Sequence, residues 1–274
     1  MWTFTDSASL VFNLTGEDSF VTVVTKEAAG PRSARDRLIL ALDFPTPDEA
    51  LAVAGRFRGR LAWAKVGMEL FTAAGPSLVG QLEDRGLKIF LDLKFHDIPN
   101  TVARAAAAAT ELGVAMFNVH ASGGREMMAG AVEAAHSRAS ALGVAPPLVI
   151  AVTVLTSIGQ ETLNREVGLA GGVADHVERF ALAARDAGCD GVVASPLEVE
   201  RIKAVCGPTF VTVTPGVRPR GNDAGDQRRT LTPGQALQAG SDYLVVGRPV
   251  TRALDPVVAL ESILSEMEEA ASHA

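Results

Sequence analysis

The sequence is poor in cysteine and in long apolar runs, and each shortage excludes a class of protein. Cys189 and Cys206 are the whole cysteine content of 274 residues. No second cysteine pair or histidine spacing would complete a zinc site, so we expect both to be reduced thiols. The apolar stretches are interrupted by charges and fall short of the ~20 residues that span a bilayer. We therefore expect no membrane span.

Basic residues are also scarce relative to acidic ones. The chain has 25 Lys and Arg against 32 Asp and Glu, a formal net charge of −7. A basic surplus is what attracts nucleic acid or anionic lipid, so neither is expected as a partner. Residues 1–14 contain Asp6 but no Lys or Arg, and so lack the basic start of a secretory signal. These features predict a cytoplasmic protein.

What the chain does have is a regular alternation of short apolar runs and longer Ala-rich amphipathic stretches, starting at Arg37. This pattern is typical of parallel strands joined by crossover helices. The predicted strands are Leu38–Asp43, Leu61–Met68, Lys88–Lys94, Met116–Ala121, Leu148–Thr156, Gly191–Ser195, Thr209–Thr214 and Asp242–Gly247. The predicted helices are Pro47–Phe57, Pro76–Arg85, Thr101–Leu112, Arg125–Leu142, Val173–Ala187, Leu197–Val205, Pro233–Ala239 and Pro256–Ala271.

Eight strand–helix pairs predict an α/β protein with the (β/α)₈ TIM-barrel fold. The alternative is an open, doubly wound sheet, which usually carries a glycine-rich turn after its first strand. Here Phe44-Pro45-Thr46-Pro47 follows that strand instead, which favours the barrel. We assign residues 37–274 to the barrel and residues 1–36 to an N-terminal extension, in which Phe20–Thr25 could form an extra strand.

Charged residues interrupt three of the predicted strands near their C-terminal ends. In the third strand, alternation places Asp92 and Lys94 on one face and the apolar Ile89 and Leu91 on the other. The C-terminal ends of the strands are where active sites of such barrels are built. We therefore expect Asp92 and Lys94 to point into the mouth of the barrel.

Two more charges occupy equivalent places in the first two strands. Asp43 ends the apolar run of the first strand, and Lys65 lies between Ala64 and Val66 in the second. Burying an ion costs several kcal/mol, so ion pairing for stability accounts poorly for four such residues. The set indicates a functional site.

Two loops have the composition of an anion site. Pro215-Gly216-Val217-Arg218-Pro219 follows the seventh strand and Gly247-Arg248-Pro249 follows the eighth, and these loops frequently bind phosphate in TIM barrels. Glycine permits close approach of the backbone, and arginine supplies a forked cationic donor. By contrast, we interpret His96 and His120 as structural histidines.

At these residues the sequence resembles the orotidine 5′-phosphate decarboxylase family, in particular its bacterial group with a long loop after the seventh strand. The resemblance runs from about Leu38 to Leu264, and its most specific string is Asp92-Leu93-Lys94-Phe95-His96-Asp97-Ile98-Pro99-Asn100-Thr101. Supporting strings are Lys65-Val66-Gly67, Asn118-Val119-His120-Ala121-Ser122-Gly123-Gly124, Thr153-Val154-Leu155-Thr156-Ser157, Ala224-Gly225-Asp226-Gln227-Arg228-Arg229, and the two anion loops.

The resemblance implies decarboxylation of orotidine 5′-phosphate to uridine 5′-phosphate by a homodimer, without a metal or an organic cofactor. It implies a catalytic network of Lys65, Asp92, Lys94 and Asp97, in which Lys94 donates the proton that replaces the carboxylate. The implied substrate contacts are Asp43 and Lys65 to ribose, Thr156 to the pyrimidine, Gln227, Gly247 and Arg248 to phosphate, and Arg218. Asp97 and Thr101 would reach the site from the partner subunit.

Two rival functions remain open from the sequence. A related sugar-phosphate decarboxylase or aldolase on the same barrel would use Mg²⁺, and retention of activity in a chelator would separate it. A non-catalytic sugar-phosphate-binding barrel would need the anion loops but would leave Lys94 without a task. We further expect the charged, glycine-containing segment Arg218–Arg229 to act as a lid over bound phosphate.

Overall fold

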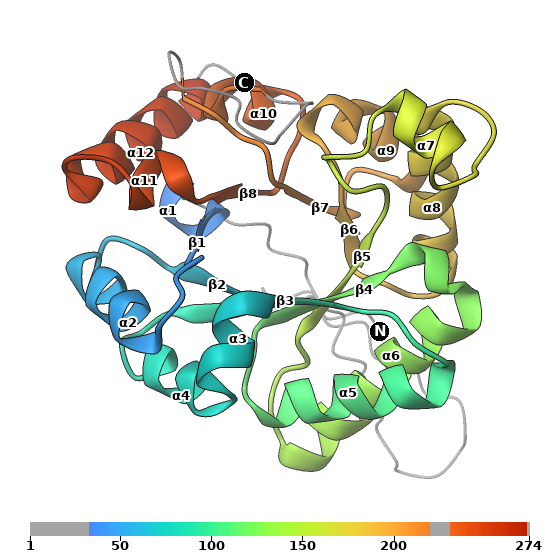
Figure 1. Ribbon diagram of the computed structural model, residues 1–274, viewed down its shortest axis with the longest axis horizontal. Helices are drawn as coiled ribbons and strands as arrows, with labels where there is room; N and C mark the ends of the chain where they lie inside the picture. The colour runs from blue at the N-terminus through green and yellow to red at the C-terminus, as the bar shows by residue number, and fades with distance from the viewer. Residues whose placement is uncertain (1–32, 220–230, 273–274) are drawn as a thin grey trace, which may run out of the picture. The chain divides into compact units, whose positions relative to one another are not determined.

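Eight short strands pair side by side in chain order until the last meets the first. The computed structural model describes residues 33–219 and 231–272, and Figure 1 shows the closed, parallel ring that they form. The strands are β1 (Leu38–Ala41), β2 (Trp63–Gly67), β3 (Lys88–Phe95), β4 (Met116–His120), β5 (Leu148–Val152), β6 (Gly191–Val193), β7 (Val211–Thr214) and β8 (Tyr243–Val246). The predicted (β/α)₈ barrel is confirmed.

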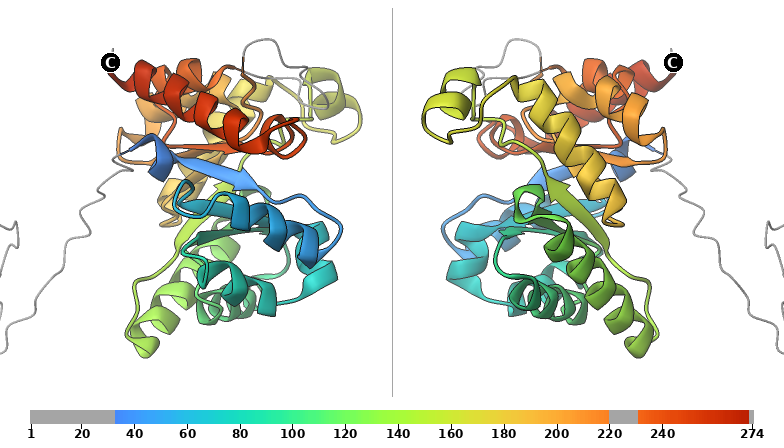
Figure 2. Two further views of the ribbon diagram at one scale, coloured as in Figure 1. Left: turned by 90° about the vertical axis from the view of Figure 1, so that its left-hand side faces the viewer. Right: turned by 90° about the vertical axis from the view of Figure 1, so that its right-hand side faces the viewer.

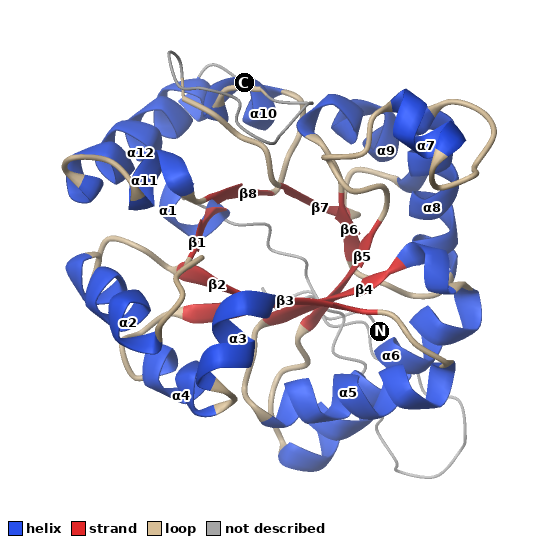
Figure 3. Cartoon of the chain, viewed as in Figure 1, coloured by secondary structure: helices blue, strands red, loops and turns tan. Residues whose placement is uncertain are grey.

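The helices surround this ring, as Figure 3 shows by colour and Figure 2 shows from two sides. Those that the sequence predicted are α2 (Pro47–Arg56), α4 (Ser77–Glu83), α5 (Pro99–Glu111), α6 (Arg125–Leu142), α8 (Val173–Asp186), α9 (Val199–Cys206), α10 (Pro233–Gln238) and α12 (Pro256–Ser272). Four shorter helices were not predicted: α1 (Ala34–Arg37), α3 (Met68–Ala74), α7 (Gln160–Arg165) and α11 (Arg248–Thr251). Each has at most two turns, too few for hydrophobic periodicity to reveal it.

Local sequence signals explain where the helices start and how closely they pack. Helix α2 begins with Thr46, whose side chain accepts a hydrogen bond from the backbone of Glu49, and with Pro47 in the first turn. Helices α5 and α6 lie side by side (Figure 1) and bury alanines such as Ala106 and Ala135. These small side chains allow the two Ala-rich helices to approach closely.

Alternation along the strands divides the core into two parts. One face packs beneath the helices, where Leu40, Val66 and Phe117 are buried. The other face fills the barrel with a smaller cluster that includes Trp63 and Tyr243, whose rings meet edge to face at 5.4 Å between centroids. Apolar packing thus fills the interior below the mouth.

The pairing of β3 with β4 is irregular at one point. Leu91 pairs with Phe117 and Phe95 pairs with Val119, so that residues 92–94 lie opposite Asn118 alone. Such a bulge leaves backbone groups without ladder partners and re-aims the side chains that follow. It occurs where β3 carries Asp92 and Lys94.

A polar cluster joins the chain at the N-terminal ends of β7 and β8. Asp242 Oδ2 accepts hydrogen bonds from Lys203 Nζ at 2.7 Å and from the Thr212 backbone at 2.7 Å. Arg37 Nε donates to the Asp242 carbonyl at 3.2 Å, and Arg37 also donates to the carbonyl of Ser241. This cluster fastens the segment before β1 to the segment before β8.

Some expectations concern residues that the structure does not describe. Nearly all of the predicted N-terminal extension, including Phe20–Thr25, lies outside the described residues, as do most of the predicted lid and Gln227. None of the helices in the described part of the chain is long and apolar enough to cross a membrane.

Candidate active site

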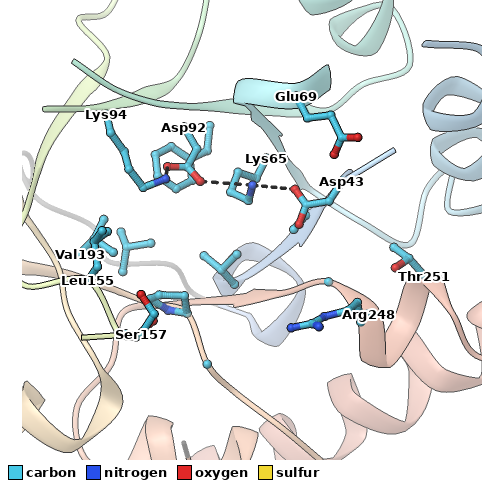
Figure 4. A pocket seen from close by; sticks show the side chains of 18 of the residues that line it. Asp43, Lys65, Glu69, Asp92, Lys94, Leu155, Ser157, Val193, Arg248 and Thr251 are labelled. Carbon is cyan, nitrogen blue, oxygen red and sulfur yellow. Dashed lines mark hydrogen bonds and ion pairs between the residues drawn. The ribbon is translucent and has the colours of Figure 1, made fainter. Parts of the chain in front are cut away.

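A cavity of about 640 Å³ opens at the C-terminal ends of the strands, the end that the sequence indicated. Figure 4 shows Asp43, Lys65, Asp92 and Lys94 along one side of it and Arg248 on another. The expected site residues that line the cavity are Asp43, Lys65, Asp92, Lys94, Thr156, Arg218, Gly247 and Arg248. These expected residues come from six of the eight strand ends or the connections that follow them.

Four of these residues form a chain of alternating charge. Lys65 Nζ lies 2.9 Å from Asp43 Oδ1 and 3.2 Å from Asp92 Oδ2, and Lys94 Nζ lies 2.6 Å from Asp92 Oδ1. Figure 4 shows Asp92 between the two ammonium groups. The Lys65 and Asp92 side chains are only 10% and 13% exposed, so water screens their attraction weakly.

The network keeps its central groups ionised. Burial opposes the charge on Asp92, but the cations of Lys65 and Lys94, with hydrogen bonds from Lys94 and Asn118, outweigh it and lower the pKa of the carboxyl. Burial likewise opposes the charge on Lys65, yet attraction to Asp92 and Asp43 raises the pKa of this amine. Each charge therefore stabilises its neighbour.

The backbone at Lys94 is unusual. Its φ angle of 54° is the one positive value among the described non-glycine residues. The left-handed region costs an ordinary L-residue about 1–2 kcal/mol, and such outliers cluster at functional sites. Here it follows from the bulge in β3 and sets the direction in which the Lys94 side chain leaves the strand.

Asn118 completes this part of the site, and sequence reasoning did not single it out. It has no exposed surface. Its Oδ1 accepts a 2.7 Å hydrogen bond from the Lys94 backbone N–H, and its Nδ2 donates a 2.7 Å hydrogen bond to Asp92 Oδ1. A polar residue between the apolar Phe117 and Val119 of β4 was the signal that could have revealed it.

His96 and His120 lie beside each other, with ring centroids 5.2 Å apart, and neither lines the cavity. Burial, and then the nearby His96 and Lys94, lower the pKa of His120, against a smaller opposing effect of Asp92. His96 is exposed, and the structural interpretation of both histidines stays a prediction.

Asp97 and Thr101 do not line the cavity of their own chain. Asp97 is exposed, and its Oδ1 accepts a 2.7 Å hydrogen bond from the backbone of Ile98. The Ile98 side chain is 66% exposed, and Thr101 lies exposed in the first turn of α5. Lys94 is the last residue of its string to line the cavity, and Phe95 packs against the core beneath the helices.

The anion loops form the opposite wall. Gly216 has a φ angle of 80°, which favours glycine, and the backbone of Arg218 donates to the Leu231 carbonyl at 3.0 Å. A Cβ atom on Gly247 would come within 3.3 Å of the Ala41 Cβ, so this position is tight. These contacts fix the loop backbones at the cavity.

Several cavity residues were not expected from the sequence. They are Phe44, Pro45, Glu69, Leu155, Ser157, Thr251 and Arg252, with apolar residues of the inner strand faces. Most lie within four residues of an expected site residue. They belong to helices α3 and α11 or to loops, and the sequence did not predict the path of the backbone in these segments. Among the described residues, no group of three or more His, Cys, Asp or Glu side chains is placed to hold a metal ion.

Comparison with known proteins gives a consistent result. Residues 36–263 match the family model described as "Orotidine 5'-phosphate decarboxylase / HUMPS family". Orotidine 5′-phosphate decarboxylase of Moorella thermoacetica is 53% identical over 235 residues, 86% of this chain and 93% of that protein. The one from Syntrophomonas wolfei is 52% identical over 237 residues, 86% of this chain and 99% of that protein.

Solved structures show the same likeness. The crystal structure of orotidine 5′-phosphate decarboxylase from Lactobacillus acidophilus superposes with a TM-score of 0.75 at 39% sequence identity. The match covers 84% of this chain and 98% of that chain. An uncharacterized conserved protein from Geobacillus kaustophilus matches with a TM-score of 0.74, also at 39% identity, over 84% of this chain and 99% of that chain.

Proposed function

The chain belongs to the orotidine 5′-phosphate decarboxylase / HUMPS family, and we propose that Lys94 is the proton donor with which it converts orotidine 5′-phosphate to uridine 5′-phosphate and CO₂. The activity is that of a carboxy-lyase in pyrimidine nucleotide biosynthesis. Relatives that are identical to this chain at over half of the aligned positions are named orotidine 5′-phosphate decarboxylase. One observation carries the assignment to Lys94: its ammonium lies in the cavity, 2.6 Å from Asp92 and linked through it to Lys65.

The chemical step requires a charge to be stabilised at carbon. The bond between C6 of the pyrimidine and the carboxylate breaks, CO₂ leaves, and the electron pair stays on C6. A proton from Lys94 Nζ then forms the new C6–H bond, which leaves the amine neutral. An oriented ammonium in a partly dry cavity stabilises the developing carbanion and needs no reorganisation.

Asp92 orients this ammonium and opposes the substrate carboxylate. Its oxygens contact both Lys94 and Lys65, so its position is fixed from two sides. Repulsion between Asp92 and the substrate carboxylate would be relieved as CO₂ departs. The larger contribution is the orientation of Lys94, because one preorganised donor commonly contributes about 3–4 kcal/mol.

The rest of the cavity suits the ribose and the phosphate. In this proposal Asp43 and Lys65 bind ribose hydroxyls and Thr156 contacts the pyrimidine, and all three line the cavity. Arg218, Gly247 and Arg248 on the far wall, joined by Gln227, would bind the phosphate. Phosphate lies far from C6, so its binding energy would act by organising the site.

The active unit in this proposal is a homodimer. Asp97 and Thr101 lie outside the cavity of their own chain and are exposed, as is the apolar Ile98 beside them. The proposal is that Asp97 and Thr101 enter the cavity of the partner subunit, where Asp97 joins Lys94 and Asp92. Independence from metals and cofactors is part of the same proposal, and the cytoplasmic location stays a prediction from the sequence.

One assay tests substrate, reaction and metal independence together. Purified protein in EDTA is mixed with orotidine 5′-phosphate, and loss of the ultraviolet absorbance of the orotate ring is followed. We expect turnover by the wild type and a fall in kcat of at least about 10³-fold in Lys94→Ala. Lys88→Ala is the matched control, since Lys88 is an exposed lysine at the other end of β3. Near-normal kcat in Lys94→Ala would remove Lys94 from the mechanism.

A further inference from the structure

We propose that Asn118 is a positioning residue for the decarboxylation, because its amide holds the Lys94 backbone and the Asp92 carboxylate in one rigid arrangement. The inference rests on the proposed role of Lys94 and adds to it. It explains how a lysine at a bulged, left-handed position keeps a single orientation.

The bulge creates the need for such a residue. Residues 92–94 of β3 lie opposite Asn118 alone. The Lys94 N–H donates to Asn118 Oδ1 at 2.7 Å, so a side chain of β4 serves as its acceptor. This hydrogen bond holds the chain at the position where φ is 54°. A left-handed residue persists only where its surroundings fix it.

The second half of the amide closes a ring of contacts. Asn118 Nδ2 donates to Asp92 Oδ1 at 2.7 Å, and that same oxygen lies 2.6 Å from Lys94 Nζ. The path therefore runs from the Lys94 backbone through Asn118 and Asp92 to the Lys94 ammonium. The Asn118 amide thus holds the Lys94 backbone directly and the Lys94 ammonium through Asp92.

The asparagine amide meets both demands, because its oxygen accepts and its nitrogen donates. An aspartate would accept from Lys94 but could not donate when ionised, and an apolar residue would do neither. Asn118 has no exposed surface, and Met116 and Ile150 on the inner strand faces near it are apolar and buried. Burying an amide is costly unless it is hydrogen-bonded, and its side-chain partners here are Lys94 and Asp92.

Asn118→Ala tests the proposal, because a positioning residue should affect kcat much more than the affinity for a bound nucleotide. We expect kcat to fall by about 100-fold, the effect of displacing a reacting group by about 1 Å. The affinity for the product uridine 5′-phosphate should change by no more than about twofold, because ribose and phosphate contact other walls. Thr110→Val, which removes a buried hydroxyl bonded to Ala106 within α5, is the control for lost stability and should keep the wild-type kcat.

Asn118→Asp separates positioning from mere packing, because the new side chain has the same shape. When ionised it cannot donate to Asp92 and repels it. Burial and Asp92 both raise the pKa of the new carboxyl, and protonation restores a donor. The other titratable groups near it are Asp92 and Lys94 on β3, Lys65 on β2, and the pair His96 and His120. They are also present in the wild type, so the informative quantity is the variant-to-wild-type ratio of kcat at each pH.

We expect this ratio to rise as the pH falls from 8 to 5, by up to about tenfold per pH unit above the pKa of the new carboxyl. A flat or falling ratio would overturn the inference however Asn118→Ala behaves. Equal losses of kcat and product affinity in Asn118→Ala would also overturn it, since they indicate a collapsed cavity. Lys94→Ala serves as the reference variant. If turnover is lost in Lys94→Ala but is normal in both Asn118 variants, only this inference is rejected. If the wild type is inactive, the proposed function is rejected.

Discussion

Replacing Lys65 by methionine is expected to destabilise the protein, because it leaves one of two acidic partners buried. Lys65 is 10% exposed and Asp92 13% exposed, whereas Asp43 is 58% exposed and can be solvated by water. Breaking a buried ion pair commonly costs about 3–5 kcal/mol. Asp92 retains Lys94 at 2.6 Å, so we expect a smaller loss of unfolding free energy, about 2–3 kcal/mol.

The pH dependence of this loss follows from the two perturbed groups. The pKa of Asp92 is lowered from 3.8, so its contribution is present above that pH and is lost as the pH falls through the folded-state value. The pKa of Lys65 is raised from 10.5, so its contribution is present below that pH and is lost as the pH rises through the folded-state value. The difference between wild type and Lys65→Met should therefore be largest between these limits.

Chemical denaturation at one protein concentration measures the effect, since association would otherwise alter the apparent stability. Adding Asp92→Asn to Lys65→Met removes the carboxylate that has lost one of its two cationic partners. The double variant should recover about 1–2 kcal/mol relative to the sum of the single changes. A loss below about 0.5 kcal/mol, or one that is the same at pH 3 and pH 7, would refute the electrostatic account of the network.

Two further predictions concern the phosphate and the subunits. Arg248→Ala should lower kcat/KM for orotidine 5′-phosphate by about 10–100-fold, the effect of one charge-assisted contact, but barely change it for the nucleoside orotidine. Equal losses with both substrates in the absorbance assay would contradict the phosphate role. If Asp97 acts in the partner's site, co-refolding the inactive variants Lys94→Ala and Asp97→Ala should restore about a quarter of the wild-type activity. Mixtures as inactive as either parent would argue against shared sites.

The architecture could be predicted from the sequence because it depends on repeated, local patterns. Eight apolar runs and eight amphipathic stretches gave the strands and main helices, and the larger errors were at ends. The fifth strand stops at Val152, not at Thr156, because polar side chains and a turn lead into α7. Helices α3, α7 and α11 escaped prediction because each is short and lies within a connection.

The charged residues at the mouth of the barrel could also be predicted, because Asp43, Lys65, Asp92 and Lys94 are charges in or next to apolar strands. What the sequence could not give was the register between β3 and β4, which depends on how two strands pack in three dimensions. The bulge at residues 92–94 and the hydrogen bonds of Asn118 follow from that register. Gln227 lies outside the described residues, and the roles assigned to the site residues stay predictions.

The pairing of β1 with β8, which closes the barrel, has a consequence for synthesis of the chain. The hydrogen bond from Arg37 to Asp242 spans 205 positions, and β1 pairs with β8 immediately beyond it. A ribosome adding about 5–20 residues per second needs roughly 10–40 s to cover that interval. Until then one edge of β1 has no partner within its own molecule, and open edges recruit other chains. The nascent polypeptide is thus exposed to aggregation at this edge until β8 has been synthesised, and chaperones would protect it over that interval.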